Sequence, residues 1–222
     1  PPRSTLFPYT TLFRSIQEET KMGDYLTLVN DRHKFSRDML SGFEFVDIVD
    51  NFGDKSYVEL KTLENFNNLA AALRAQGIKI TINSAGRTIE DQKRAFLELE
   101  KTHGTEYAES HTALPYHSEH HTGLAIDVKL ESIKGGLIRR GIFGKVHEKL
   151  THEKRDMYDV LHALMPEYGF IERYTEAKQD ITHVPPERWH MRYVGRDNAL
   201  NITASGLSLE EYVATREQVR VS

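Results

Sequence analysis

The chain is organised around residues 118–127, which read SEHHTGLAID. An apolar run at residues 124–126 leads into Asp127 and Val128, a pattern that is typical of a short buried strand. A carboxylate that is buried without a partner is costly, because the charge loses its hydration. Asp127 therefore needs a strong partner, and a metal ion is one candidate. His120 lies in the same stretch and supplies a second potential ligand.

A second stretch, ERWH, begins at Glu187 and ends at His190, and strand-like residues 191–194 follow it. His120, Asp127 and His190 together make three potential metal ligands. Catalytic zinc sites typically use three protein ligands and leave the fourth position to water. Glu187 is not needed as a ligand, so it can act as a general base. Taken singly, either histidine would more often be an ordinary surface or core residue, and the joint pattern is what favours a metal site.

Both stretches resemble motifs of the zinc D-alanyl-D-alanine carboxypeptidases of the VanY type. SEHHTGLAID is similar to that family's Ser-x-His-x-x-Gly-x-Ala-x-Asp motif, and ERWH is similar to its Glu-x-Trp-His motif. The similarity extends over residues 26–195. The resemblance implies one zinc ion per chain, bound by His120, Asp127 and His190, with Glu187 as the general base. The family leaves the positions of the neighbouring histidines, His117 and His121, variable, so we interpret both as pocket wall or solvated loop.

Residues 84–92, SAGRTIEDQ, resemble a Ser-Gly-Tyr-Arg-Ser segment of the same family that is followed by a glutamine. Arg87 and Gln92 fall on the matching arginine and glutamine, whereas the glycine, Gly86, lies one place late. The resemblance implies that Arg87 contacts the carboxylate of the substrate, which suits a planar two-pronged donor. The alternative is a surface or capping arginine. We place Gln92 in the same substrate-binding group. Ser118 either orients a ligand or touches substrate, or it is a simple turn residue.

Composition narrows the class of protein. The chain has 222 residues, of which 39% are hydrophobic and 28% charged, which is ordinary for a globular protein of one good-sized domain or two small ones. The net charge of −4 gives no electrostatic case for nucleic acid. No run approaches the ~18 apolar residues of a membrane helix. The absence of cysteine excludes disulfides and thiolate zinc sites. We expect a monomer.

The first residues of the chain look foreign. Residues 5–15 read TLFPYTTLFRS, which matches the translation of a sequencing-adapter oligonucleotide. We therefore interpret residues 1–15 as a non-native tail and assign residues 16–222 to one domain. The alternative is a genuine disordered tail. On the first interpretation a native signal or anchor has been lost from this end, and the resemblance implies an extracytoplasmic protein of the cell envelope or a secreted one.

Hydrophobic periodicity and end signals predict the elements around the motifs. We expect strands at residues 25–30 and 78–83, strand pieces within a loop at 31–57, a polar loop at 103–117, and helices at 58–76, 88–101, 155–165 and 208–217. Thr88 with Asp91, and Ser208 with Glu211, resemble capping boxes. Residues 129–154 form either a flap beside the site or a solvated insertion. We predict an α+β fold: a single domain with a small, mostly antiparallel sheet, flanking helices and the zinc site at the sheet.

The resemblance implies a bacterial zinc metallopeptidase that removes a C-terminal D-alanine from a peptidoglycan stem peptide. Two alternatives stay open. The same site could open cross-links as an endopeptidase or lysin, or the metal fold could serve binding alone, as in the hedgehog signalling domain, whose zinc site is similar. Glu187 beside a complete ligand set argues against the binding alternative. D,D- and L,D-cleavage are both compatible with the motifs, because pocket shape decides between them.

Overall fold

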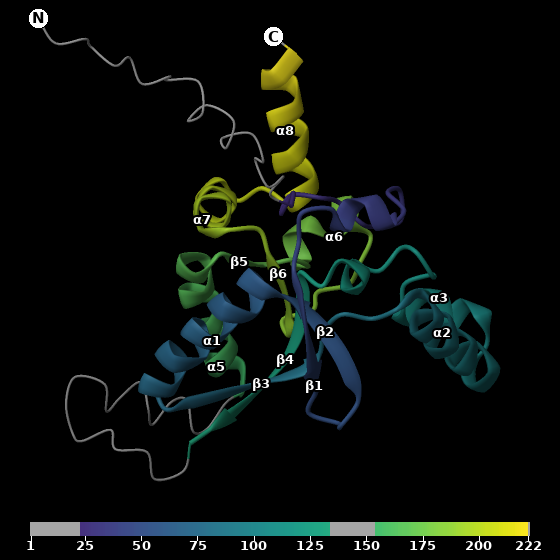
Figure 1. Ribbon diagram of the computed structural model, residues 1–222, viewed down its shortest axis with the longest axis horizontal. Helices are drawn as coiled ribbons and strands as arrows, with labels where there is room; N and C mark the ends of the chain where they lie inside the picture. Colours follow the sequence, from purple (N-terminus) through teal and green to yellow (C-terminus); the bar gives the residue numbers. More distant parts are fainter. Residues whose placement is uncertain (1–22, 134–153, 222) are drawn as a thin grey trace, which may run out of the picture.

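A four-stranded sheet forms the centre of the computed structural model, which describes residues 23–133 and 154–221 (Figure 1). Every neighbouring pair of strands is antiparallel. In spatial order the strands are β3 (Ile78–Ser84), β4 (Ala125–Ser132), β6 (His190–Tyr193) and β5 (Phe170–Glu172). This mixed architecture, with helices packed around a small antiparallel sheet, confirms the predicted fold class.

The register of β4 brings the two sequence motifs together. Asp127 on β4 pairs with His190 on β6 on one side, and with Ser84 at the end of β3 on the other. The β3–β4 register shifts between Ile82 and Ser84. Because β4 lies between β3 and β6, residues that are far apart in the chain meet at Asp127. The strand that was predicted from the apolar run at residues 124–126 is β4, and it positions the candidate ligands.

A separate hairpin supports the turn that follows β3. It consists of β1 (Phe45–Val49) and β2 (Lys55–Glu59), which pair antiparallel. Tyr57 on β2 forms an isolated bridge with Gly86, and a Cβ atom at Gly86 would lie 2.3 Å from the carbonyl oxygen of Tyr57. Only glycine fits such a close approach of two backbones. Gly86 therefore lets the hairpin lie directly against the turn that carries Arg87.

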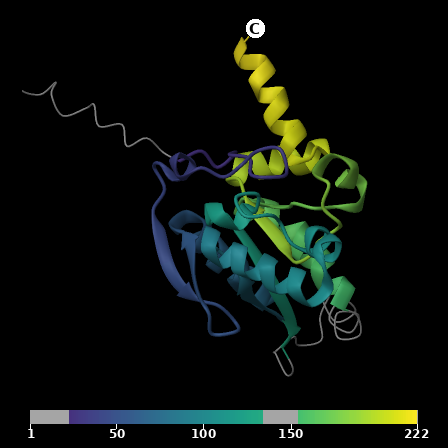
Figure 2. The same ribbon diagram turned by 90° about the vertical axis from the view of Figure 1, so that its right-hand side faces the viewer.

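Two helices cover the sheet on one side. Helix α1 (Leu60–Ala75) packs against β3, and α5 (Lys154–Leu164) packs against β4. Their apolar side chains join those of the strands in the main core, which includes Phe66, Leu69, Leu73, Ile80, Val128 and Leu161. Helices α2 (Ile89–His103) and α3 (Thr105–His111) lie on the opposite side of the molecule from α1 and α5 (Figures 1 and 2).

The C-terminal part forms a second, smaller core. Helices α7 (Arg196–Ser205) and α8 (Leu209–Val221) contribute to a cluster of Ile171, Val194, Ala199, Ile202 and Leu209. Helix α8 projects away from the body of the protein in both views (Figures 1 and 2). None of the helices within the described residues is long and apolar enough to span a bilayer.

Most predicted helices are confirmed, with shifted ends. The helix expected at residues 58–76 begins at Leu60, because Val58 belongs to β2. The capping box at the start of α8 is reciprocal: Glu211 N–H donates to Ser208 Oγ at 3.2 Å, and Ser208 N–H donates to Glu211 Oε2 at 2.7 Å. At the start of α2 only one half of the capping box forms: Asp91 N–H donates to Thr88 Oγ1. The Asp91 carboxylate accepts from the Thr88 hydroxyl and not from the Thr88 backbone N–H.

Three predictions of local structure are wrong. Residues 25–30 form turns and irregular backbone, and the carbonyl groups of Tyr25 and Thr27 accept hydrogen bonds from the Arg192 side chain instead of from a neighbouring strand. The polar loop expected at residues 103–117 contains α3, and neither β5 nor α7 was predicted. Of the expected flap or insertion at 129–154, residues 129–132 belong to β4, while 134–153 lie outside the described residues, as does the tail at 1–15.

Candidate metal centre and active site

Three potential ligands converge at the end of the central sheet. His120 lies on the short 3-10 helix η2 (Glu119–Thr122), Asp127 lies on β4, and His190 opens β6. One ligand atom from each lies within 4.8 Å of the others. Two imidazoles and one carboxylate at this spacing are a donor set that suits zinc.

Each histidine presents a different ring nitrogen to the cluster. His120 Nδ1 lies 2.6 Å from the carbonyl oxygen of Ala85, so Nδ1 carries the hydrogen, while Nε2 lies 3.3 Å from Asp127 Oδ2. His190 Nδ1 lies 2.9 Å from Asp127 Oδ1, while Nε2 faces Glu119 Oε2 at 3.5 Å. Metal-binding histidines generally donate their second ring N–H to an acceptor in this way, which fixes the tautomer and the ring orientation.

The electrostatics of the cluster favour a positive charge at its centre. Burial alone would lower the pKa of His190, but its hydrogen bonds to Asp127 and Glu119 outweigh burial and raise the pKa to about 9. Burial alone would raise the pKa of Asp127, but His120 and His190 hold it well below its usual range. Two imidazoles and a carboxylate whose ligand atoms converge in this way are donors that a divalent cation can share, so the residues fit the implied zinc ion.

Glu187 lies at the edge of this cluster. Its backbone N–H donates to the carbonyl oxygen of Tyr174 at 3.1 Å, and its own carbonyl oxygen accepts from His190 N–H at 3.0 Å. Its Oε2 lies 3.8 Å from His190 Nδ1, and its side chain is 30% exposed. Burial raises the pKa of Glu187, and the charge of Asp127 adds to this rise against the opposing effect of His190. A partly exposed carboxylate with a raised pKa beside potential ligands is suited to general-base chemistry.

Arg87 is joined to the cluster through its backbone and is held through its side chain. Its N–H donates to the carbonyl oxygen of His120 at 3.0 Å. Its guanidinium donates from Nη1 to Gln92 Oε1 and from Nη2 to Ser84 Oγ, both at 2.9 Å. Gln92 and Ser84 are both neutral, so they orient the half-buried guanidinium without neutralising its positive charge. The charge therefore stays available to bind an anionic group.

Gln92 and Ser118 support the neighbouring residues. Gln92 is fully buried, and its Nε2 donates to Thr112 Oγ1 at 3.0 Å and to the carbonyl oxygen of Ala113 at 2.6 Å. Its amide thus ties Arg87 to the segment that follows α3. Ser118 is also buried, and its Oγ accepts from the His120 N–H at 3.3 Å, which caps η2.

His121 is buried, so the interpretation of this histidine as part of a solvated loop is wrong. Its Nδ1 lies 2.7 Å from the carbonyl oxygen of Arg87, and its Nε2 accepts from Tyr116 N–H at 3.2 Å. Tyr116 has a left-handed backbone, with φ at 73°. His117 Nδ1 in turn lies 2.7 Å from the carbonyl oxygen of Asn30.

Glu119 was missed by sequence reasoning. It occupies the variable position between Ser118 and His120, yet it is fully enclosed and contacts His190, Arg173 and Arg192. One signal was available: Arg192 follows His190 at the spacing that places both on one face of a strand. An arginine on the same strand face as a buried histidine is itself buried and needs a carboxylate nearby.

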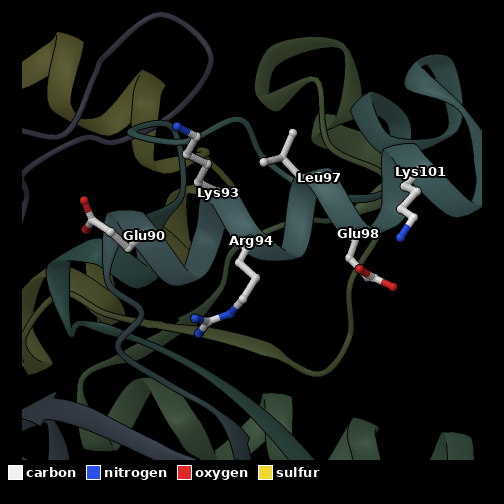
Figure 3. A pocket seen from close by; sticks show the side chains of 6 residues that line it. All are labelled: Glu90, Lys93, Arg94, Leu97, Glu98 and Lys101. Carbon is white, nitrogen blue, oxygen red and sulfur yellow. The ribbon is translucent and has the colours of Figure 1, made fainter.

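The hollow in Figure 3 is separate from this site. Its lining residues all belong to α2: Glu90, Lys93, Arg94, Leu97, Glu98 and Lys101. The side chains spread along one helix instead of converging from several elements (Figure 3). None of these six side chains is a candidate ligand, general base or substrate-binding residue of the site at the end of the sheet.

Two histidines and an aspartate, with a glutamate beside them, therefore form a candidate metal centre at the end of an antiparallel sheet. The family model "VanY: D-alanyl-D-alanine carboxypeptidase" matches residues 55–196. The chain therefore belongs to the VanY family of D-alanyl-D-alanine carboxypeptidases, which act on peptidoglycan, and the sequence resemblance is confirmed.

Among curated relatives, the chain is similar to VanXYC of Enterococcus gallinarum, a bifunctional D-Ala-D-Ala dipeptidase and D-Ala-D-Ala carboxypeptidase. The two are 37% identical over 144 residues, which cover 63% of this chain and 70% of the relative. The chain spans between 54% and 61% of the length of three further carboxypeptidase relatives.

Solved structures share the fold. A mutant of the D,D-pentapeptidase VanY from the VanB-type resistance cassette, in complex with Zn(II), has a TM-score of 0.64 at 28% identity and covers 85% of this chain and 98% of its own. VanYB in complex with D-Ala-D-Ala has a TM-score of 0.65 at 28% identity, with coverage of 86% and 98%. The LD-carboxypeptidase LdcB has a TM-score of 0.64 at 28% identity, with coverage of 86% of both chains.

Proposed function

We propose that this protein is a zinc metallopeptidase that removes the C-terminal D-alanine from peptidoglycan stem peptides. The convergence of His120, Asp127 and His190, with Glu187 at the edge of the cluster, is the observation that carries the proposal. One zinc ion per chain would be held by the two histidines and the aspartate. Because the substrate lies outside the cytoplasmic membrane, we place the protein in the cell envelope or the extracellular medium.

Each residue then has a chemical task. When bound, zinc would supply Lewis-acid polarisation of the scissile carbonyl and lower the pKa of the attacking water. Glu187 takes a proton from that water and passes it to the leaving amine. Arg87 pairs with the terminal carboxylate of the substrate. Gln92 and Ser118 complete the substrate-binding group by holding Arg87 and the η2 turn in place.

L,D-cleavage is the second candidate, and the similarity to LdcB favours it. The two activities differ in the residue that precedes the terminal D-alanine. A D,D-enzyme shortens a pentapeptide stem that ends in D-Ala-D-Ala, and an L,D-enzyme shortens a tetrapeptide stem. Endopeptidase action on cross-links would require no free terminal carboxylate, so a guanidinium held by two neutral acceptors, Gln92 and Ser84, supports trimming over endopeptidase action.

Mass spectrometry of products from defined pentapeptide and tetrapeptide stems tests the proposal. We expect loss of a single D-alanine from the pentapeptide by zinc-loaded protein, and none by the Glu187→Gln variant. Loss from the tetrapeptide alone would assign the L,D-activity, and internal cuts would assign an endopeptidase. Zinc-loaded protein that leaves every stem and cross-linked peptide intact would overturn the enzymatic proposal.

A further inference from the structure

We propose that Glu119 is a positioning residue: by accepting a hydrogen bond from Nε2 of His190, it holds the ring so that Nδ1 faces Asp127 and the proposed metal site. This inference rests on the proposed zinc site and assigns a task to a residue outside the ligand set. The inference is based on the different partners of the two oxygens of the buried Glu119 carboxylate. Oε2 faces His190 Nε2 at 3.5 Å, whereas Oε1 accepts from Arg173 Nε and from Arg192 Nη1, both at 2.8 Å.

The charges around Glu119 make it a fixed acceptor. Arg173 and Arg192 have fully buried side chains, and a guanidinium has only donors to offer. Two such donors engage Oε1, so the carboxylate acts as a hydrogen-bond acceptor. Where His190 Nε2 faces the other oxygen, Nε2 is therefore the nitrogen that donates a hydrogen. Nδ1, which faces Asp127, is then the ring nitrogen that a metal ion would engage, displacing any proton there.

The same carboxylate is held in place from two directions. Arg192 Nη2 donates to the carbonyl oxygens of Tyr25 and Thr27, at 3.1 Å and 2.7 Å. Arg173 donates from both terminal nitrogens to Glu210, at 2.9 Å and 2.6 Å. Glu119 and Glu210 balance the charges of the two arginines, so this buried group does not depend on His190 for neutrality. The arginines can therefore hold Glu119 at a fixed position whether or not a metal is bound.

Glu119→Gln tests the tautomer directly, because glutamine has nearly the same shape. Its amide oxygen must take the Oε1 position, since an NH₂ group there would oppose two guanidinium donors. The NH₂ group would then face His190 Nε2 and favour the tautomer with hydrogen on Nδ1. That tautomer has no lone pair on the metal side. Loss of a metal-supporting partner of this kind typically lowers metal affinity by about 10–100-fold, and we expect this loss for Glu119→Gln.

Glu210→Gln is the matched control. It removes one negative charge from the same arginine network, but the Glu210 side chain pairs with Arg173 and Asn30 and not with His190. Zinc dissociation constants from chelator competition, with thermal unfolding of each full-length variant, separate the two roles. We expect both variants to be less stable than the native protein and only Glu119→Gln to lose zinc affinity.

The outcomes separate this inference from the zinc proposal itself. Native protein that takes up no zinc overturns both. Native protein that binds zinc, together with equal affinities in the two variants, overturns the role of Glu119 alone. If Glu119→Gln does not fold, nitrogen NMR of isotope-labelled histidine in zinc-loaded native protein decides the matter. We expect hydrogen on Nε2 of His190 and on Nδ1 of His120; hydrogen on Nδ1 of His190 would refute the inference.

Discussion

Replacing Arg87 by alanine should impair recognition of the substrate's carboxylate while zinc stays bound. A guanidinium has five N–H donors, of which one on Nη1 and one on Nη2 are used by Gln92 and Ser84. The remaining donors suffice for a bidentate pair with a terminal carboxylate. The link from Arg87 to the metal cluster is its backbone N–H, which donates to His120. Alanine keeps that N–H, so zinc affinity should not change.

The expected loss follows from the charge of the lost contact. A hydrogen bond to a charged group contributes about 1.5–3 kcal/mol. If the contact is made in the transition state, Arg87→Ala should lower kcat/KM by about 10–200-fold. Ser84→Ala removes one of the two anchors of Arg87 but keeps the guanidinium, so it should cost less. This graded pair distinguishes the charge of Arg87 from its orientation.

A double cycle of enzyme and substrate changes provides the assay. Stem peptides with a free and with an amidated C-terminus are compared in the native enzyme and in Arg87→Ala. Amidation should harm the native enzyme about as much as the substitution does, and it should add little further harm in the variant. Equal cleavage of free and amidated peptides by the native enzyme would refute recognition of the carboxylate and leave the endopeptidase alternative.

Three further predictions test other parts of the site. Glu187→Gln should retain zinc by elemental analysis and lose about 10²–10⁴-fold in turnover, as expected for a general base; loss of zinc and fold together would make Glu187 structural. Gly123→Ala should destabilise the protein by about 1–3 kcal/mol in urea unfolding, because Gly123 has φ at 68° and a Cβ there would meet a Phe45 ring atom at 2.8 Å; unchanged stability would contradict this. Burial would raise the pKa of Glu210, but Arg173 outweighs burial and lowers it. A lowered folded pKa stabilises the protein above the unfolded value of about 4.3 and loses that stabilisation as pH falls through the folded pKa. In Glu210→Gln, the free energy of unfolding should therefore decrease less steeply as the pH falls into the acid range. The same acid dependence in the variant and the native protein would argue against the pairing of Glu210 with Arg173.

The sequence predicted best where local pattern and chemistry agree. The apolar run before Asp127 indicated a buried strand, and β4 begins at Ala125. The two motifs indicated His120, Asp127 and His190 as ligands, and the structure brings these three side chains together. The strand register brings the ligands together, because Asp127 on β4 pairs with His190 on β6. Their role as zinc ligands stays a prediction, which elemental analysis of the purified protein tests.

Sequence reasoning failed where one side chain substitutes for an expected backbone partner. The pattern of residues 25–30 is strand-like, but Arg192 provides the hydrogen bonds that a neighbouring strand would have given. Helix α3 was hidden because its polar sequence has a single buried apolar side chain, Ala108. Gln92 is fully buried and binds Arg87, Thr112 and Ala113, contacts that the sequence did not indicate, while its place in the substrate-binding group stays a prediction. The contacts of Arg192 and Gln92 join segments that are distant in sequence, so no local pattern could reveal them.

The site contains one buried carboxylate, Glu119, and one partly buried carboxylate, Asp127, and their partners explain why only Asp127 was recognised. A buried carboxylate needs a compensating charge, and for Asp127 the amino-acid sequence alone is enough to predict such a partner. The same requirement applies to Glu119, which lies in the same stretch, but Glu119 precedes the strand and follows no periodic pattern. Asp127 faces two imidazoles, which can exchange a proton for a metal ion. Glu119 faces two guanidiniums, which keep their protons and exclude a metal from Oε1. The type of cation beside each carboxylate therefore separates a candidate ligand from a residue that orients one.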